Sequence, residues 1–209
     1  MNHLLSKIGS YPFEKLNLLH RDIKPSKEVI NLSIGEPKLN ADSKVLDILN
    51  KETNSFSNYP PMNAVPELSE AYRQYLKNHF GIENVAEDEV CLVAGTREGT
   101  FSIIQALFNK ENVKEKPYVV MPNPFYQIYG GATTLAGGEA KFLDCPEEDN
   151  FQPDLDSLKS EDWQKCQILV LCSPNNPTGS VLPLSKLKNI LDLAEKYDFY
   201  VVSDECYVD

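Results

Sequence analysis

The strongest constraint on the fold is an alternation that begins near residue 88. Short apolar runs are separated there by segments with helical periodicity. Such runs indicate strands that are buried on both faces, which is typical of a parallel sheet. Right-handed crossovers would then place helices on both sides of the sheet. The sequence therefore predicts an α/β fold with strands near residues 90–94, 118–121, 140–143, 168–172 and 200–203.

The segments between these runs, and those before them, predict helices. We expect helices over 96–108 and 184–198, and a broken helix over 125–138. Upstream we expect a short helix over Phe13–Arg21 and another that begins at Pro66, because proline is tolerated in the first turn. An amphipathic helix near 41–53 is predicted from an apolar stripe of Val45, Leu46, Ile48 and Leu49.

Composition excludes several classes of function. A formal charge of -11 argues against a nucleic-acid partner, which would need clustered Lys and Arg. No apolar run approaches the roughly 18 residues of a membrane helix, and the N-terminus does not read as a secretory signal. The three histidines lack metal-ligand spacing, so no metal site is expected. Reduced thiols in a cytoplasmic protein are expected from five scattered cysteines, Cys91, Cys145, Cys166, Cys172 and Cys206.

The predicted sheet also indicates where a ligand would bind. Ligands of open α/β sheets lie beyond the carboxyl ends of the strands. The segments that follow four of the apolar runs are Gly95–Arg97, Asn123–Tyr126, Ser173–Gly179 and Asp204–Tyr207. These segments are therefore the candidates for chemistry.

Two of the segments offer a helix start and an aromatic side chain. Thr96 follows a glycine at a helix start, where free N–H groups and the helix dipole attract anions; alternatively, Thr96 merely caps its helix. Tyr126 can stack on a planar ligand, or it can simply be packed.

The other two segments offer amides and a carboxylate. The turn SPNNPTG is constrained by two prolines and a glycine, and it presents two Asn amides. Such a rigid turn can serve ligand binding, or it can have a purely structural role. Asp204 is expected at the end of an apolar strand, where its carboxylate would be shielded from water and would need a positive or hydrogen-donating partner. The alternative is that Asp204 only forms a structural ion pair.

Taken together and in this order, the segments resemble the fold-type I pyridoxal-phosphate (PLP) aminotransferases of class I/II. The most specific part is SPNNPTG, followed about 25 residues later by D-x-x-Y in SDECY; NLSIGEP, AGTREG and PNPFYQIYGGA also match. The sequences of these segments are most similar to the succinyldiaminopimelate aminotransferase branch. The resemblance implies that residues 1–40 form an N-terminal arm and part of a small domain. It also implies that residues 41–209 form the N-terminal part of the large PLP-binding domain.

The resemblance also implies roles for individual residues. Asp204 matches the aspartate that pairs with the pyridine nitrogen and keeps the ring protonated. The phenolic oxygen of the cofactor would be bonded by Asn176 and Tyr207. Tyr126 matches the aromatic residue that stacks on the ring, and Thr96 and Arg97 match the helix start that cradles the phosphate. Tyr59 resembles a tyrosine that reaches the cofactor of a neighbouring subunit, which implies a homodimer, and Gly35 resembles a glycine near the substrate carboxylate.

The resemblance sets an expectation for activity as well. In the family, the lysine that holds the cofactor covalently and an arginine for the substrate carboxylate lie further along the chain than residue 209. We therefore expect the 209 residues to be a fragment without turnover of its own. The full protein would move an amino group between an amino acid and a 2-oxo acid. The alternatives are an aspartate- or alanine-type aminotransferase, a PLP-dependent C–S lyase or synthase, and a non-enzymatic aminotransferase-like sensor module.

Overall fold

The computed structural model describes residues 2–9, 11–35, 39–59, 65–111 and 116–208. The chain divides into two compact units. One unit joins residues 1–9 to residues 93–209, and the other comprises residues 10–92. The predicted domain boundary at residue 40 stays a prediction. In the described part of the chain, no helix is both long and apolar enough to cross a membrane.

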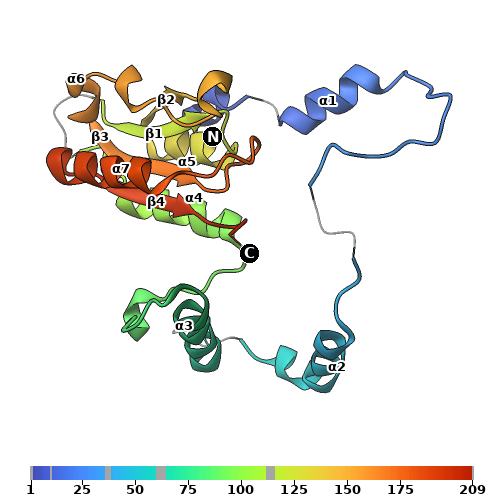
Figure 1. The fold of residues 1–209 in the computed structure, drawn as a ribbon. Coiled ribbons are helices and arrows are strands. Elements are labelled where there is room, and N and C mark those ends of the chain that lie inside the picture. Colours follow the sequence, from blue (N-terminus) through green and yellow to red (C-terminus); the bar gives the residue numbers. More distant parts are fainter. Residues whose placement is uncertain (1, 10, 36–38, 60–64, 112–115, 209) are drawn as a thin grey trace. The chain divides into compact units, whose positions relative to one another are not determined.

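The larger unit is built on a four-stranded sheet in which every neighbouring pair of strands is parallel (Figure 1). The strand order is β2-β1-β3-β4. The strands are β1 (Tyr118–Asn123), β2 (Glu139–Asp144), β3 (Cys166–Cys172) and β4 (Tyr200–Asp204). These bounds confirm four of the five predicted strands and the parallel α/β fold.

The remaining prediction, a strand near residues 90–94, is wrong. This segment contains no strand; it follows a 3₁₀ turn, Glu87–Glu89, and Val93 is 46% exposed. A strand exists only through hydrogen bonds to a neighbour, and none of the four described strands pairs with this run. Apolar character alone therefore misplaced it.

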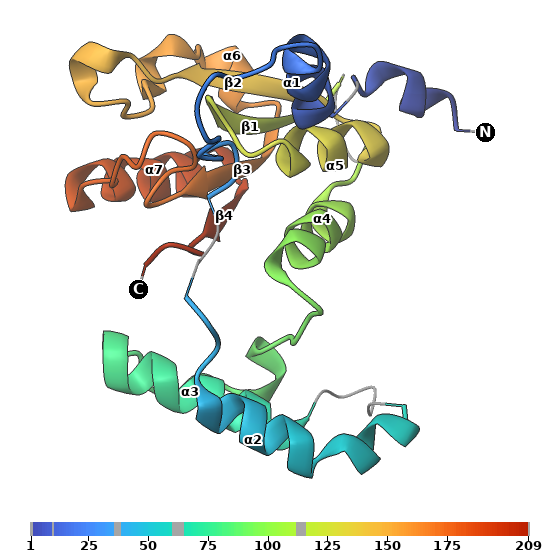
Figure 2. The ribbon, with the colours of Figure 1, turned by 90° about the vertical axis from the view of Figure 1, so that its right-hand side faces the viewer.

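Helices cover both faces of the sheet, as predicted. Figure 2 shows α7 (Leu184–Tyr197) on one side and α4 (Thr96–Leu107) and α5 (Ile128–Ala136) on the other. The predicted broken helix at 125–138 is thus shorter than expected, and Gly137 ends it with φ +86°. A short helix, α6 (Ser160–Trp163), precedes β3.

Alternation along the strands divides the apolar side chains into two cores. Val120 and Leu169 face α7 and pack with Ile190 and Trp163. Their neighbours Val119 and Ile168 belong to the second core, which also includes the following side chains of β1, β3, α4 and α5: Met121, Val170, Ile104, Phe108, Tyr129 and Ala132. Because successive strand residues point to opposite faces, a continuous apolar run fills both cores.

The other unit contains the three predicted N-terminal helices. These are α1 (Pro12–His20), α2 (Ser43–Lys51) and α3 (Pro66–Phe80), which begins at Pro66 as expected. Gly81 ends α3 in the left-handed conformation, φ +67°, which glycine adopts without a Cβ clash. The predicted apolar stripe of α2 is exposed along its length.

Candidate functional site

The order of the strands reverses direction between β1 and β3. These two strands are neighbours, yet β1 is followed in the chain by β2 on one side, and β3 is followed by β4 on the other. The connections leave the sheet in opposite directions at this border, which is the position where open α/β sheets bind ligands. The segments after β1, β3 and β4 therefore gather at one end of the sheet, as the sequence predicted.

Asp204 is the last residue of β4 and lies in register with Cys172 of β3. Its Oδ2 accepts a hydrogen bond of 2.6 Å from the hydroxyl of Tyr129, which projects from α5. The amide of Cys206 is 3.4 Å from its Oδ1. Among the described residues, no Lys, Arg or His forms an ion pair with Asp204. The structural ion pair considered from the sequence is therefore not found there.

Tyr129 was missed by the sequence reasoning. Its side chain is fully buried, and burial raises the pKa of its hydroxyl, with a further contribution from Asp204. The hydroxyl therefore stays protonated and acts as a donor. The sequence did contain a signal, because Tyr129 follows Tyr126 by about one helical turn. In the structure the two rings meet edge-on, with their centroids 5.8 Å apart.

Two cysteines border Asp204 but are poor nucleophiles. Burial, with the neighbouring Asp204, raises the pKa of the Cys206 thiol to about 11. Burial also raises the pKa of the Cys172 thiol, whose sulfur is 3.1 Å from the Pro174 carbonyl oxygen. Both thiols are therefore protonated near neutral pH, and thiolate chemistry is not favoured at this site.

The turn after β3 uses its two asparagines differently. Asn175 is buried, and its Nδ2 donates to Thr178 Oγ1 at 2.9 Å, while its backbone amide donates to Ser180 at 2.8 Å. Asn176 lies further out, and its Nδ2 is 3.4 Å from the Tyr207 hydroxyl. The sequence suggested that both amides are presented; that was wrong for Asn175, which holds the turn together.

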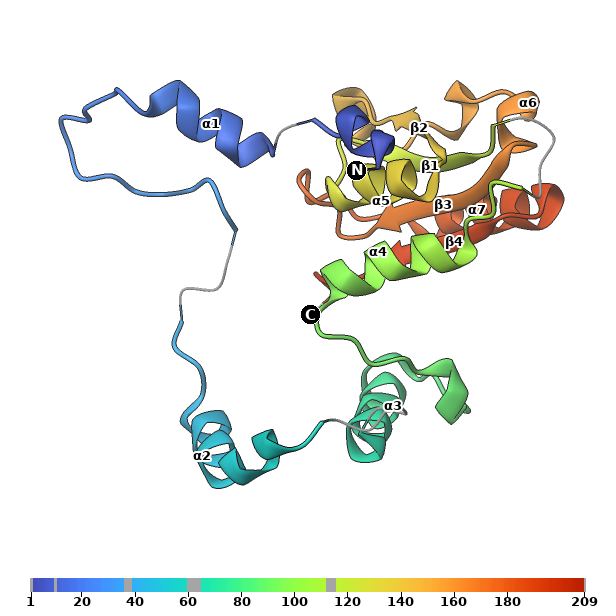
Figure 3. The same ribbon diagram turned by 180° about the vertical axis from the view of Figure 1, so that it is seen from behind.

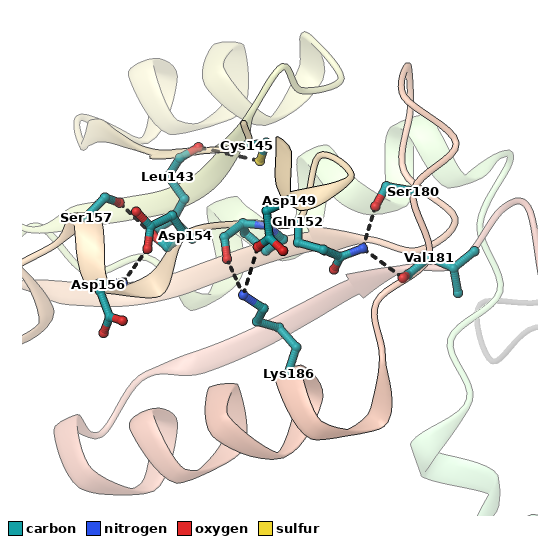
Figure 4. A network of polar contacts seen from close by, with 11 residues as sticks. Leu143, Cys145, Asp149, Gln152, Asp154, Asp156, Ser157, Ser180, Val181 and Lys186 are labelled. Carbon is teal, nitrogen blue, oxygen red and sulfur yellow. Dashed lines mark hydrogen bonds and ion pairs between the residues drawn. The ribbon is translucent and has the colours of Figure 1, made fainter. Parts of the chain in front are cut away.

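A polar network fixes the far side of this turn (Figure 4). Gln152 Nε2 donates to Ser180 Oγ at 2.6 Å and to the Val181 carbonyl at 2.9 Å. Lys186 of α7 donates to the Pro153 carbonyl at 3.1 Å. The segment after β2 thus ties the turn to the start of α7. The turn that carries Asn176 is therefore held by this network as well as by its own Asn175–Thr178 hydrogen bond.

Tyr207 comes from the loop after β4 and meets Asn176 across the carboxyl ends of β3 and β4. It is 50% exposed, and partial burial raises the pKa of its hydroxyl, with Cys206 next in effect. A protonated hydroxyl and an amide side by side form a pair of donors suited to an oxyanion. Asn176 and Tyr207 are thus in contact at the end of the sheet where Asp204 lies, and a single site formed by all three residues stays a prediction.

Helix α4 begins at the same end of the sheet (Figures 1 and 3). Its N-cap is Gly95, with φ 134° and no side-chain cap hydrogen bond. Thr96 is the first helical residue, so the interpretation that it merely caps the helix is wrong. The first intrahelical bond runs from Gly99 to the Gly95 carbonyl. The earlier amides, including those of Thr96 and Arg97, point toward the positive end of the helix dipole.

Comparison with known proteins identifies the family. The Aminotransferase class I and II family matches residues 27–209 of the chain. The chain belongs to this family.

Relatives of this aminotransferase-family chain agree with that assignment. An aspartate aminotransferase from Pyrococcus horikoshii is 30% identical over 194 residues, which is 92% of this chain and 48% of the relative. An LL-diaminopimelate aminotransferase from Natranaerobius thermophilus is 26% identical over 98% of the chain and 53% of its own length. A solved aminotransferase from Neisseria meningitidis is 41% identical, with a TM-score of 0.90 over 99% of this chain and 53% of that one. This aminotransferase-family chain therefore spans about half the length of the relatives it matches.

Two predicted site residues lie in the other unit. Tyr59 is 99% exposed, and Gly35 has nothing within 4 Å of the position of an added Cβ. Their proposed roles, at a neighbouring subunit's cofactor and near a substrate carboxylate, stay predictions. The same holds for stacking by Tyr126, which is half-buried here.

Proposed function

We propose that this chain forms the cofactor-binding half of a PLP-dependent aminotransferase that moves an amino group between an amino acid and a 2-oxo acid. The observation that carries the proposal is the state of Asp204. Its carboxylate is held by Tyr129 at the carboxyl end of β4 and has no cationic partner among the described residues. A half-buried carboxylate of this kind favours a cationic hydrogen-bond donor, which the protonated pyridine nitrogen of PLP supplies.

The remaining groups suit the other parts of PLP. Asn176 and Tyr207 can both donate to its phenolic oxygen, because their polar atoms are 3.4 Å apart. The N-terminal amides of α4, with the Arg97 side chain, suit its phosphate. The Tyr126 ring suits its aromatic face. When bound, the cofactor supplies an electron sink for the carbanion formed at Cα of the substrate.

The named relatives suggest a class of substrate. Aspartate and diaminopimelate both carry a second carboxylate, as does the succinylated diaminopimelate indicated by the sequence segments. We infer that the full protein acts on amino acids of this kind. A homodimer and a cytoplasmic location belong to the same proposal and rest on the family resemblance.

Binding to the 209-residue chain tests the cofactor half of the proposal. We expect PLP to bind weakly and non-covalently, with a shift in its absorbance, and Asp204→Asn to weaken that binding. Tyr118→Phe is the matched control, because Tyr118 begins β1 at the opposite end of the sheet. Equal binding by wild type and Asp204→Asn would contradict the site.

Borohydride reduction adds a second test. We expect no stoichiometric adduct at one lysine within residues 1–209, since the family's lysine lies further along. Mass spectrometry that finds a single, fully occupied phosphopyridoxyl-lysine here would overturn the assigned roles. For the full-length protein, a panel of amino donors with 2-oxo acids separates transamination from the lyase and synthase alternatives by its products.

A further inference from the structure

Tyr129 holds the Asp204 carboxylate more firmly than any other described group does. Its hydroxyl lies 2.6 Å from Oδ2, whereas the Cys206 amide lies 3.4 Å from Oδ1. A separation of 2.6 Å is typical of a strong hydrogen bond to a charged acceptor, and one of 3.4 Å is weak. The orientation of the carboxylate therefore depends chiefly on Tyr129.

The tyrosine is itself rigidly placed. It belongs to α5 and is fully buried in the core shared with β1 and β3. Thr133, one turn later, donates from its hydroxyl to the Tyr129 carbonyl at 2.8 Å, and the Tyr126 ring packs edge-on against the Tyr129 ring. A side chain fixed in this way can impose one direction on its partner.

The hydrogen bond from Tyr129 also makes the two oxygens of the Asp204 carboxylate different. Oδ2 is occupied by a hydroxyl that remains a donor, since burial and Asp204 both raise the pKa of Tyr129. Among the described residues, Oδ1 accepts a long hydrogen bond from the Cys206 amide, and the weakly donating Cys206 thiol lies beside the carboxylate. Oδ1 is thus the oxygen left with capacity for another donor.

We propose that Tyr129 is a positioning residue for the reaction, which orients Asp204 so that one oxygen is presented to the ring nitrogen of the cofactor. The inference rests on the proposed function and deepens it. Tyr129 does not touch the cofactor; it acts through Asp204. Loss of its hydroxyl frees the carboxylate to rotate, so the carboxylate spends less time aligned with the ring N–H.

The test uses pyridoxine 5′-phosphate, which lacks the aldehyde and therefore reports the ring without covalent attachment. Absorbance of the bound probe is followed against pH for wild type, Tyr129→Phe, Asp204→Asn and the double variant, with Tyr118→Phe as control. Asp204→Asn is expected to lower the midpoint of ring-nitrogen titration by about 1 to 3 pH units. Tyr129→Phe is expected to lower it by part of that, about 0.5 pH unit or more.

The double variant decides whether Tyr129 acts through Asp204. In the Asp204→Asn background, Tyr129→Phe is expected to add no further shift, because the group that it orients no longer carries charge. An equal shift in both backgrounds would overturn the positioning role. So would an unchanged midpoint in Tyr129→Phe while Asp204→Asn shifts it, and that result leaves the proposed cofactor site standing. No probe binding by wild type, or no effect of Asp204→Asn, refutes the proposed function itself.

Phenylalanine retains the ring that fills the core, and thermal melts check that the variant is folded. If its melting midpoint lies below the assay temperature, the titration is repeated on a chain with 4-fluorophenylalanine at position 129. Its fluorine fills nearly the space of the hydroxyl but cannot donate a hydrogen bond to Asp204. A lowered midpoint supports the proposal, and an unchanged one overturns it.

Discussion

Two adjacent isoleucines of α4 allow the energy that anchors this helix to be measured. Ile104 is 0% exposed and lies in the core between the sheet and helices α4 and α5, whereas its neighbour Ile103 is 39% exposed. The change Ile→Ala gains the same helix propensity at both positions, so the difference between the two variants isolates burial. Because α4 also presents Thr96 and Arg97 at its start, its anchoring bears on the candidate site.

The expected difference follows from the burial. Truncation of a fully buried Ile costs about 2 to 5 kcal/mol, from lost transfer energy and the cavity left behind. The half-exposed Ile103 forfeits only part of the roughly 1.5 to 3 kcal/mol that full burial contributes. We therefore expect Ile104→Ala to lower the free energy of unfolding by about 2 kcal/mol more than Ile103→Ala does.

Urea denaturation measures this difference. Trp163 is the one tryptophan of the sequence and is buried in the larger unit, so its fluorescence reports that unit alone. With a slope of about 2 kcal/mol per molar urea, the two midpoints should differ by about 1 M. Midpoints that agree within error, with equal slopes, would refute the placement of Ile104 in the core.

Three further outcomes are expected. The Lys141 ammonium beside Asp162 lowers the pKa of that carboxyl, so the pair stabilises the fold above the ordinary Asp pKa and the effect is lost as pH falls through the lowered one. The stability difference between wild type and Asp162→Asn should then be about 1 kcal/mol or less at pH 7 and should shrink below about pH 4; a difference independent of pH would contradict this. At pH 8, iodoacetamide should modify the exposed Cys91 before Cys206, whose pKa is raised to about 11, and peptide mass spectrometry that finds equal rates would argue against the raised pKa. In a full-length protein with the proposed function, Asp204→Ala should reduce transamination far more than cofactor affinity, because the phosphate-binding groups remain; near-normal turnover would exclude a role of Asp204 in supporting the electron sink.

The sheet could be predicted from the sequence wherever a strand is buried on both faces. Runs such as that over 168–172 are apolar throughout because alternate residues fill two different cores. The run at 90–94 has the same character but no partner among the described strands. Pairing is a property of two segments, so one run cannot reveal it.

The candidate site was predictable only in part, for a similar reason. The strand-end rule selected the segments that contain Asp204, Asn176 and Tyr207, and the family resemblance then assigned roles to these three residues. Asn176 and Tyr207 are in contact at that end of the sheet. The rule alone could not distinguish Asn175 from Asn176, because that depends on which amide turns inward to Thr178. It also missed Tyr129, whose hydroxyl reaches an acceptor 75 residues away in the chain.

The strand order has a consequence for how the chain folds as it is made. Tyr118 of β1 pairs with Glu139 on one side and with Cys166 on the other, so the first strand synthesised ends up inside the sheet. At about 5 to 20 residues per second, the ribosome needs several seconds to proceed from β1 to β3. During that time one edge of β1, in which Val119, Val120 and Met121 become fully buried, has no neighbour. The nascent chain should therefore be a client of chaperones that bind extended apolar segments, and its exposure to them should end when β3 emerges.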